Sequence, residues 1–517
     1  MHLSRLAATY GAKPAVVMAN SREVMTYREL EERSNRIAQL FRQRGLRPGD
    51  HIAILLANQI ELFPIVWAAQ RSGLLYTPVN WHLSEAEAAY IVADCGARML
   101  ISAASLEPVA AAAATAAPAL ESRVVVGDVA GQQSLDDAVA GLPASPIDDE
   151  VEGNYMFYSS GTTGRPKGIT PELSGAPFGT GLTIDTTMAT AFGFSADSVY
   201  LCPGPLYHAA PLGWSIGTIR NGGTVVVMER FDARQVLELV QEQRVTHGQF
   251  VPTMFVRMLK LDSTVRAAHD LSSLQVVVHA AAPCPVEVKQ KMIDWVGPIL
   301  LEYYAGSEGN GFCMIDSPTW LERRGSVGRA LIGEVHVCDG DGVELEPGQI
   351  GTIWFGGTKR FAYHNDPGKT ASAYNDRGWS TLGDLGHVDP AGFVYLSDRR
   401  SDLIISGGVN VYPREIEDVL VLHPAVADVA VIGLPDEEMG QRVHAVVQPA
   451  AQELPDTLAD ELIAFCRERI AGFKVPRTFT FDREFPRLPS GKVLRRVLVE
   501  RYGPASSSAA SSSAPSA

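Results

Sequence analysis

A run of eleven residues, "YSSGTTGRPKG" (158–168), contains the residue types that bind phosphate. Its glycines let backbone N–H groups converge on an anion, and its hydroxyl and lysine side chains add hydrogen-bond donors and one mobile positive charge. Strand-like residues 155–158 precede it, so we expect the loop at a strand end, where ligands of open α/β sheets collect. The spacing differs from G-x-x-x-x-G-K-[ST], because Lys167 precedes a glycine rather than a hydroxyl residue. Alone, the stretch fits a phosphate site or a flexible surface loop.

Four further stretches follow the loop and carry side chains suited to nucleotide chemistry. They are "YYAGSEG" (303–309) with an aromatic ring and a carboxylate, "WSTLGDLG" (379–386) with Asp384, "LSDRRSDLIISGG" (396–408) with Arg399, and "RLPSGKVLRR" (487–496) with Lys492. A carboxylate is an acceptor-only group and suits sugar hydroxyls or a cation, whereas lysine and arginine neutralise phosphate oxygens. Singly, each has an ordinary alternative: a core tyrosine, a turn-capping aspartate, a surface arginine or a solvated lysine.

The five motifs, in this order, resemble the adenylate-forming superfamily of acyl- and aryl-CoA synthetases, peptide-synthetase adenylation domains and beetle luciferases. The resemblance covers about residues 20 to 497. It implies an enzyme that uses ATP and Mg²⁺ to convert a carboxylic acid into an acyl-adenylate with release of pyrophosphate. The acyl group then passes to a thiol, usually that of CoA. Because the developing charge lies on phosphate oxygens, catalysis of this kind depends on positioning and electrostatics.

The resemblance assigns the phosphate and metal contacts. Thr162 to Lys167 hold the β- and γ-phosphates, and Glu308 with Thr162 binds Mg²⁺, a hard cation that prefers carboxylate and phosphate oxygens. Ser307 stands where most of the family has threonine and keeps the hydroxyl. The residues implied to catalyse the reaction are Lys492, Glu308 and Lys167.

The remaining nucleotide contacts follow from the same likeness. Tyr304 lies against the adenine, Asp384 accepts both ribose hydroxyls, and Arg399 donates to the ribose or a nearby phosphate. The full implied nucleotide-binding set is Ser159, Ser160, Gly161, Thr162, Thr163, Gly164, Lys167, Ala281, Ala282, Tyr303, Tyr304, Ala305, Gly306, Ser307, Asp384, Arg399 and Lys492.

A small C-terminal domain is expected to rotate between the two half-reactions. One pose presents Lys492 to the α-phosphate and the acid's carboxylate oxygen, and the other presents Gly407 and Gly408, whose small size lets the pantetheine arm of CoA pass. The pivot falls on Ser401, where many relatives have aspartate or lysine; a small hinge residue is physically acceptable.

The acid is expected to bind around His208, which borders its carboxylate. The other implied lining residues are Trp214, Phe250, Met254, Ala280, Ala282, Gly306, Gly311 and Phe312. The set contains no aspartate that could hold an amino group and no arginine that could hold a second carboxylate. The small residues leave space for length. The sequence therefore predicts an apolar monocarboxylic acid, either a medium- or long-chain fatty acid or a bulky aromatic or steroid-type acid.

Other functions remain open at this point. An adenylation enzyme that loads a carrier protein would often be fused to a carrier domain. The Ser/Ala-rich C-terminal stretch does not resemble such a domain. A catalytically inactive homologue would lose Lys167, Glu308, Asp384, Arg399 or Lys492, and all five are present. A luciferase-type oxidase is a fourth alternative.

Alternating helix and strand patterns must position these residues. Residues 26–46 predict a capped helix, because Thr26 and Glu29 have capping-box spacing. Residues 51–57, 223–228 and 274–282 are apolar runs typical of buried strands, and a helix is predicted over 232–245. This alternation predicts an α/β fold with layered parallel sheets.

The chain is predicted to divide into a large and a small domain. Residues 1–397 form the AMP- and acyl-binding domain, which includes a small β-barrel-like subdomain from about residue 326. A hinge over 398–402 leads to a mobile α+β domain over 403–500, and the low-complexity tail 501–517 is expected to be disordered.

Composition limits the class of partner. The net charge of −15 argues against a nucleic-acid binder, which usually presents a basic face, and leaves small anions open. The six cysteines lack metal-ligand spacing, so we expect a reducing, cytoplasmic compartment. We see no signal peptide and no transmembrane segment, while peripheral membrane contact and the oligomeric state are left open.

Overall fold

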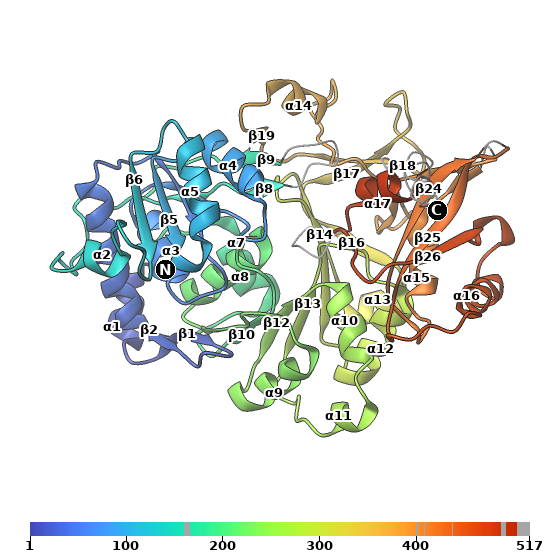
Figure 1. The fold of residues 1–517 in the computed structure, drawn as a ribbon, viewed down its shortest axis with the longest axis horizontal. Coiled ribbons are helices and arrows are strands. Elements are labelled where there is room, and N and C mark those ends of the chain that lie inside the picture. The colour runs from blue at the N-terminus through green and yellow to red at the C-terminus, as the bar shows by residue number, and fades with distance from the viewer. Residues whose placement is uncertain (160–165, 400–401, 408, 437, 488–492, 504–517) are drawn as a thin grey trace, which may run out of the picture.

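The computed structural model describes the chain except residues 160–165, 400–401, 408, 437, 488–492 and 504–517 (Figure 1). The predicted pivot Ser401 and most of the predicted tail therefore lie outside the described residues. The exact domain limits stay predictions.

The first sheet is parallel and has five strands in the order β6-β5-β3-β4-β7. Its strands are β3 (His51–Leu55), β4 (Leu75–Pro78), β5 (Met99–Ala103), β6 (Ser122–Val126) and β7 (Asn154–Tyr155). The apolar run that begins at residue 51 forms β3, and all five of its residues are buried. This is the environment of a central parallel strand, which helices cover on both faces.

The second sheet has thirteen strands and a parallel centre. Its parallel strands are β1 (Pro14–Met18), β10 (Val199–Cys202), β11 (Thr224–Val227), β12 (His247–Phe250), β13 (Val276–His279) and β14 (Leu300–Ala305). Its antiparallel strands are β2 (Val24–Thr26), β15 (Phe312–Asp316), β16 (Ser326–Ile332), β17 (Glu334–Cys338), β18 (Gly351–Gly356), β20 (Asp384–Val388) and β21 (Val394–Arg399). The strands expected as a barrel-like subdomain thus continue the path of the large sheet, which ends at β17.

Helices and sheets form five alternating layers. Between the two sheets lie α2 (Tyr27–Gln43), α3 (Leu62–Arg71), α7 (Thr183–Phe192) and α8 (Ala209–Arg220). The outer layers are α4 (Glu85–Asp94) and α5 (Glu107–Ala116) on the first sheet, and α9 (Ala233–Gln243), α10 (Pro252–Leu259) and α12 (Val286–Val296) on the second. The remaining α-helices among the described residues of this part are α1 (Leu3–Tyr10), α6 (Leu135–Val139), α11 (Ser263–Ala267), α13 (Ser317–Glu322) and α14 (Pro367–Ser372).

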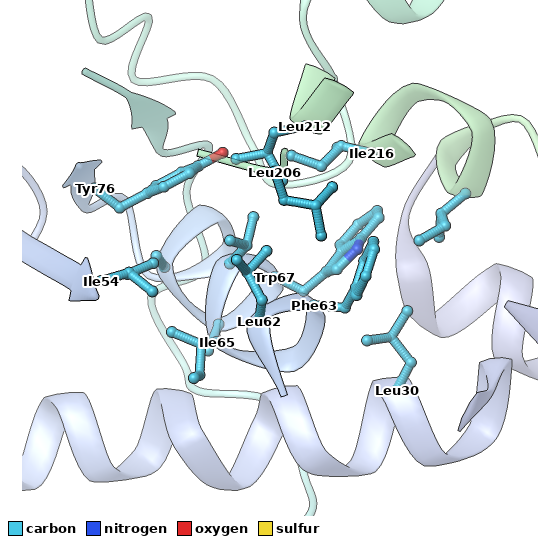
Figure 2. Close-up of a cluster of buried hydrophobic side chains, with 14 of the residues drawn as sticks. Leu30, Ile54, Leu62, Phe63, Ile65, Trp67, Tyr76, Leu206, Leu212 and Ile216 are labelled. Atoms are coloured by element: carbon cyan, nitrogen blue, oxygen red, sulfur yellow. The ribbon is translucent and has the colours of Figure 1, made fainter. Parts of the chain in front are cut away.

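The core between the sheets sets the spacing of the layers. Leu30 of α2, Phe63 and Trp67 of α3, and Leu212 and Ile216 of α8 meet there with almost no exposed surface (Figure 2). Fully burying side chains of this size contributes about 1.5–3 kcal/mol each. The predicted capping box is confirmed, since Thr26 and Glu29 satisfy each other's backbone N–H groups at the start of α2.

A smaller α+β region follows β21. Its sheet has the order β23-β22-β25-β24, with β26 beside β25. Its elements are β22 (Ile404–Ser406), β23 (Val409–Val411), α15 (Pro413–Leu420), β24 (Val426–Asp436), β25 (Gly440–Pro449), α16 (Leu458–Arg467), β26 (Thr478–Phe481) and α17 (Arg495–Tyr502). It has its own apolar core, and Arg414 Nη1 donates to the carbonyl of Leu396 at 2.9 Å across the join.

Candidate active site

A separate three-stranded sheet supports the glycine-rich loop. β8 (Tyr158–Ser159) pairs with β9 (Lys167–Thr170), and Ser159 lies opposite Lys167. The loop between them, with the predicted Ser160, Gly161, Thr162, Thr163 and Gly164, lies outside the described residues. The third strand is β19 (Ala362–Tyr363), which pairs antiparallel with β9. The loop thus joins the two strands of a hairpin, and β19 pairs with the outer edge of β9.

Strand β14 of the large sheet carries the "YYAGSEG" motif at its end. Tyr304 is the fifth residue of β14, and its hydroxyl donates to Asp384 Oδ2 at 2.7 Å. Asp384 begins β20 and lies opposite Arg399 in the pairing of β20 with β21. The backbone of Arg399 is therefore next to Asp384, and its side chain is outside the description. The fold brings together motifs that are 80 residues apart in the chain.

Glu308 is half-buried beyond the end of β14. Its Oε1 accepts a hydrogen bond of 3.0 Å from the hydroxyl of Tyr363, and the Nζ of Lys167 lies 5.7 Å from the centre of the same tyrosine ring. Burial, and then the nearby ammonium of Lys369, lower the pKa of Lys167. The predicted phosphate and metal residues Lys167 and Glu308 thus both contact one side chain.

The donors at Glu308 fit Mg²⁺ held jointly by protein and substrate. Glu308 forms no ion pair with any described residue, and the described part of the chain contains no cluster of three or more metal-ligating side chains. Mg²⁺ is commonly bound by one or two carboxylates together with substrate phosphates and water. A single carboxylate beside the phosphate loop therefore suits this ion better than an ion that needs an all-protein cage.

The turn after β13 is strained at Ala281. This residue has φ of +72°, in the left-handed region that costs a non-glycine residue about 1–2 kcal/mol. Ala281 and Ala282 are exposed, whereas Ala280 before them is buried. Strained backbone is concentrated at functional sites, where the surrounding structure holds it. This supports the predicted contact of the 281–282 turn with the base.

His208 lies at the start of α8 with an unsatisfied ring nitrogen. Its Nε2 is inaccessible to solvent and has no hydrogen-bond partner among the described residues. Burial lowers the pKa of His208 to about 4, so the ring is neutral near pH 7. A neutral imidazole can donate one hydrogen bond to a carboxylate, which suits the predicted position beside the acid.

The residues predicted to line the acid pocket fall on two faces of the large sheet. Trp214 and Phe312 both stack on Tyr303, with ring centres 5.9 and 5.1 Å apart, on the face toward the first sheet. Phe250 and Met254 pack instead into the core on the opposite face, with α9, α10 and α12. Alternate strand residues point to opposite faces of a sheet. A single acid pocket lined by all of these residues stays a prediction.

Two glycines of the predicted acid pocket lie against bulky neighbours: Gly306, which was expected to leave space, and Gly311, which was expected to line the pocket. A Cβ added to Gly311 would overlap the ring of Phe355, and one added to Gly306 would overlap the side chain of Leu382. These glycines permit close packing between strands and neighbouring loops. Room for a long acyl chain in this pocket stays a prediction.

The predicted C-terminal contacts are only partly described. Gly407 has φ of +58°, a conformation that favours glycine, and a Cβ there would lie 2.5 Å from the Met439 methyl group. Lys492, Ser401 and Gly408 lie outside the described residues. Their roles stay predictions.

Sequence reasoning missed Tyr363 and Asn310. No local signal in the segment around Tyr363 connects it to Glu308. Asn310 is fully buried two residues after Glu308, and its amide has no hydrogen-bond partner among the described residues. Only its closeness to the "YYAGSEG" motif could have suggested a role.

The layered fold and the convergence of these motifs define a class of nucleotide-dependent enzymes. The family model "AMP-binding enzyme" matches residues 3–362, and "AMP-binding enzyme C-terminal domain" matches residues 415–492. The chain belongs to the AMP-binding enzyme family, the adenylate-forming acid–thiol ligases. Enzymes of this family use ATP and CoA.

Two curated relatives and one solved structure show what this chain is similar to. A feruloyl-CoA synthase from Amycolatopsis sp is 34% identical, with 95% of this chain and 96% of the relative covered. Long-chain-fatty-acid–CoA ligase FadD13 from Mycobacterium tuberculosis is 32% identical, with 92% and 93% covered. The o-succinylbenzoate CoA synthetase (MenE) from Bacillus subtilis, in complex with its acyl-adenylate intermediate, superposes with a TM-score of 0.80 at 28% identity, covering 96% of this chain and 97% of that one.

The helices in the described part of the chain are short or polar in comparison with a membrane span. None of its helices combines the length and apolar character needed to cross a bilayer.

Proposed function

We propose that the protein is an ATP-dependent carboxylic acid:CoA ligase that forms an acyl-adenylate from an apolar monocarboxylic acid and transfers the acyl group to CoA. One observation carries the proposal. Two carboxylates, Glu308 and Asp384, each accept a hydrogen bond from a tyrosine, and Lys167 of the phosphate-loop hairpin lies against one of these tyrosines. Asp384 can accept hydrogen bonds from a ribose, and Glu308 can bind a metal cation. Lys167 places a positive charge beside them for the phosphates.

In the adenylation step, a carboxylate oxygen of the acid attacks the α-phosphorus of ATP. The bond from that phosphorus to the bridging oxygen breaks, and pyrophosphate leaves with the electron pair. Lys167, with the loop that precedes it, neutralises charge on the leaving group. Lys492 is proposed to neutralise the α-phosphate. Mg²⁺ at Glu308 and Thr162 would supply further charge neutralisation at the phosphate oxygens.

The nucleoside and the acid are held by groups that do not ionise during this step. Asp384 keeps lone pairs for the ribose hydroxyls in addition to the bond from Tyr304. The strained turn at Ala281 presents its backbone to the base. His208, neutral because its pKa is about 4, donates to the acid's carboxylate without giving up a proton. A carboxylate is already the nucleophile, so no general base is needed.

In the second step, the sulfur of CoA forms a bond to the acyl carbonyl carbon and its thiol proton is released to water. The bond from that carbon to the phosphate oxygen breaks, and AMP leaves with the electron pair. We propose that the small domain rotates about Ser401 for this step and presents Gly407 and Gly408 to the pantetheine arm. Such lid and domain motions often limit the turnover of enzymes that close over their substrates.

A specific observation favours a ring-bearing acid as a second candidate to the fatty acid. Trp214, Tyr303 and Phe312 form an aromatic stack on the face where the acid is expected. Aromatic side chains recognise rings by offset stacking worth about 0.5–1.5 kcal/mol per pair. The side chain of Leu382, which lies close to Gly306, is consistent with a compact rather than a long acid.

The proposal is tested with a panel of acids. The protein is incubated with ATP, Mg²⁺ and either C8–C16 fatty acids or aromatic and polycyclic monocarboxylic acids, and AMP and thioester are measured with and without CoA. We expect AMP and a CoA thioester from at least one acid. If AMP forms without a CoA thioester and an added carrier protein becomes acylated, the acyl acceptor is a carrier protein and not CoA. No AMP from any acid would refute the ligase function.

The two-pose assignment is tested with Lys492→Ala. We expect loss of AMP formation from ATP and acid, while thioester formation from preformed acyl-adenylate and CoA continues. Equal loss of both half-reactions would contradict the assignment.

A further inference from the structure

Tyr363 belongs to a segment that follows the antiparallel strands and returns to the phosphate-loop hairpin. In β19, Tyr363 lies opposite Ile169 of β9, which is almost two hundred residues earlier in the chain. The backbone N–H of His364 donates to the carbonyl of Gly168 at 2.8 Å. A short helix, α14 (Pro367–Ser372), follows. The segment therefore forms the third strand of the sheet that carries Lys167.

The backbone of this segment is held independently of the Tyr363 side chain. The hydroxyl of Tyr374 accepts from the N–H of Phe361 at 2.6 Å and donates to its carbonyl at 3.0 Å. The N–H of Tyr363 itself donates to Thr370 Oγ1 at 2.9 Å. The hydroxyl of Tyr363 is thus not needed to hold the strand in place, and its contact with Glu308 calls for a different explanation.

The Tyr363 side chain contacts both groups of the proposed phosphate end. Its hydroxyl donates to Glu308 Oε1 at 3.0 Å, and its ring faces the ammonium of Lys167 at 5.7 Å. The ring contact is near the outer limit of about 6 Å for a cation–π interaction and is therefore the weaker of the two. The hydrogen bond fixes the rotation of the carboxylate. This matters for Mg²⁺, which requires near-ideal octahedral geometry.

We propose that Tyr363 is a positioning residue for the metal-binding carboxylate. Its hydroxyl orients Glu308 toward Mg²⁺, and its ring keeps Lys167 beside the same phosphates, so one side chain connects the metal site to the phosphate loop. The inference rests on the proposed function, because it takes Glu308 as the metal-binding residue. Groups that orient a metal ligand in this way are typically worth about 10–100-fold in metal affinity.

The test compares two tyrosines of the same segment. Mn²⁺ replaces Mg²⁺ as a probe, and its binding to the full-length protein in the presence of ATP is measured by electron paramagnetic resonance, without any acid. For Tyr363→Phe we expect about tenfold weaker Mn²⁺ binding. Tyr374→Phe removes a hydroxyl that bonds to the backbone of Phe361 and not to Glu308 or Lys167. We therefore expect wild-type Mn²⁺ affinity for this variant.

Two further measurements separate orientation from structure. The Mg²⁺ concentration that half-saturates ATP–pyrophosphate exchange should rise about tenfold in Tyr363→Phe, while thioester formation from preformed acyl-adenylate stays at the wild-type rate. In Glu308→Gln, the added Tyr363→Phe change should have little effect on Mn²⁺ binding, because residues that act through one another are not additive. Tyr363→Leu, which also lacks the ring, should additionally weaken metal-free ATP binding.

Three results would overturn the inference. They are wild-type Mn²⁺ affinity in both Tyr363 variants, an equal loss in Tyr374→Phe, and additive losses in the double variant. Failure of the proposed function is seen elsewhere, in the wild-type protein. If wild type forms no AMP from any acid yet binds Mn²⁺ with ATP in a Tyr363-dependent manner, the ligase function fails and the inference holds.

Discussion

The proposed ribose end and phosphate end of the nucleotide site each contain a tyrosine that donates a hydrogen bond to a carboxylate. The two pairs differ in the sheets that carry them. At the ribose end, Tyr304 donates to Asp384 at 2.7 Å, and both residues belong to strands of the large sheet. At the phosphate end, Tyr363 donates to Glu308 at 3.0 Å, and the tyrosine comes from a small separate sheet. The proposed nucleoside contacts thus belong to one continuous sheet, whereas the proposed phosphate contacts lie where that sheet and the small sheet meet.

The largest expected difference is at Glu308. Glu308→Gln should lower AMP formation by about 100-fold or more, because a preorganised charge at the reacting phosphates is lost. ATP–pyrophosphate exchange measures this loss, and thioester formation from preformed acyl-adenylate should continue. Glu322→Gln, at the exposed end of α13, is the matched control and should leave both reactions unchanged. Equal loss in both half-reactions would remove the distinction between the two ends.

Asp384→Asn tests the ribose end. We expect ATP affinity to fall about tenfold or more, because hydrogen bonds to a charged acceptor are worth about 1.5–3 kcal/mol. Equilibrium titration with ATP and with adenosine should show the same loss for both ligands, since the change concerns the nucleoside. The Mg²⁺ requirement should not change. A raised Mg²⁺ requirement would show that the two ends do not act separately.

The pH dependence should also distinguish the ends. Burial and Lys369 lower the pKa of Lys167, so this ammonium loses its charge at a lower pH than an exposed lysine as the pH rises. ATP affinity should therefore fall on the alkaline side, while adenosine affinity stays level over the same range. Lys167→Arg keeps its charge and should abolish the alkaline fall in ATP affinity. An alkaline fall for adenosine as well would contradict the assignment of Lys167 to the phosphate end.

The smallest expected effect concerns the strained turn at the nucleoside end. Ala281→Gly should raise the free energy of unfolding by up to about 1 kcal/mol, because glycine adopts the positive φ of this residue without strain. Ala282→Gly, whose φ is not positive, should lower it by about 0.5–1 kcal/mol. Urea unfolding of both variants measures the difference. Destabilisation in both would mean that the turn at Ala281 stores no strain.

Local sequence patterns predicted the elements and the order of the motifs well. The capping box at Thr26 and the apolar runs that became β3, β11 and β13 depend on neighbouring residues, so they can be read directly from the chain. The family, and with it the acid–thiol ligase class, likewise followed from five local motifs. Placement across the sheet was less predictable. Phe250, for example, packs on the face of the large sheet opposite Trp214, because the direction of the side chain reverses from one strand residue to the next.

The sequence by itself determined which chemical groups are available: a glycine-rich loop with Lys167, and two carboxylates, Glu308 and Asp384, in ordered motifs. Only the tertiary structure decided which groups meet. Tyr363 reaches Glu308 through the pairing of β19 with β9, and the ring of Phe355 packs directly against Gly311. Both contacts join segments that are far apart along the chain. Such contacts depend on strand order and packing, which leave no local pattern in the residues that make them.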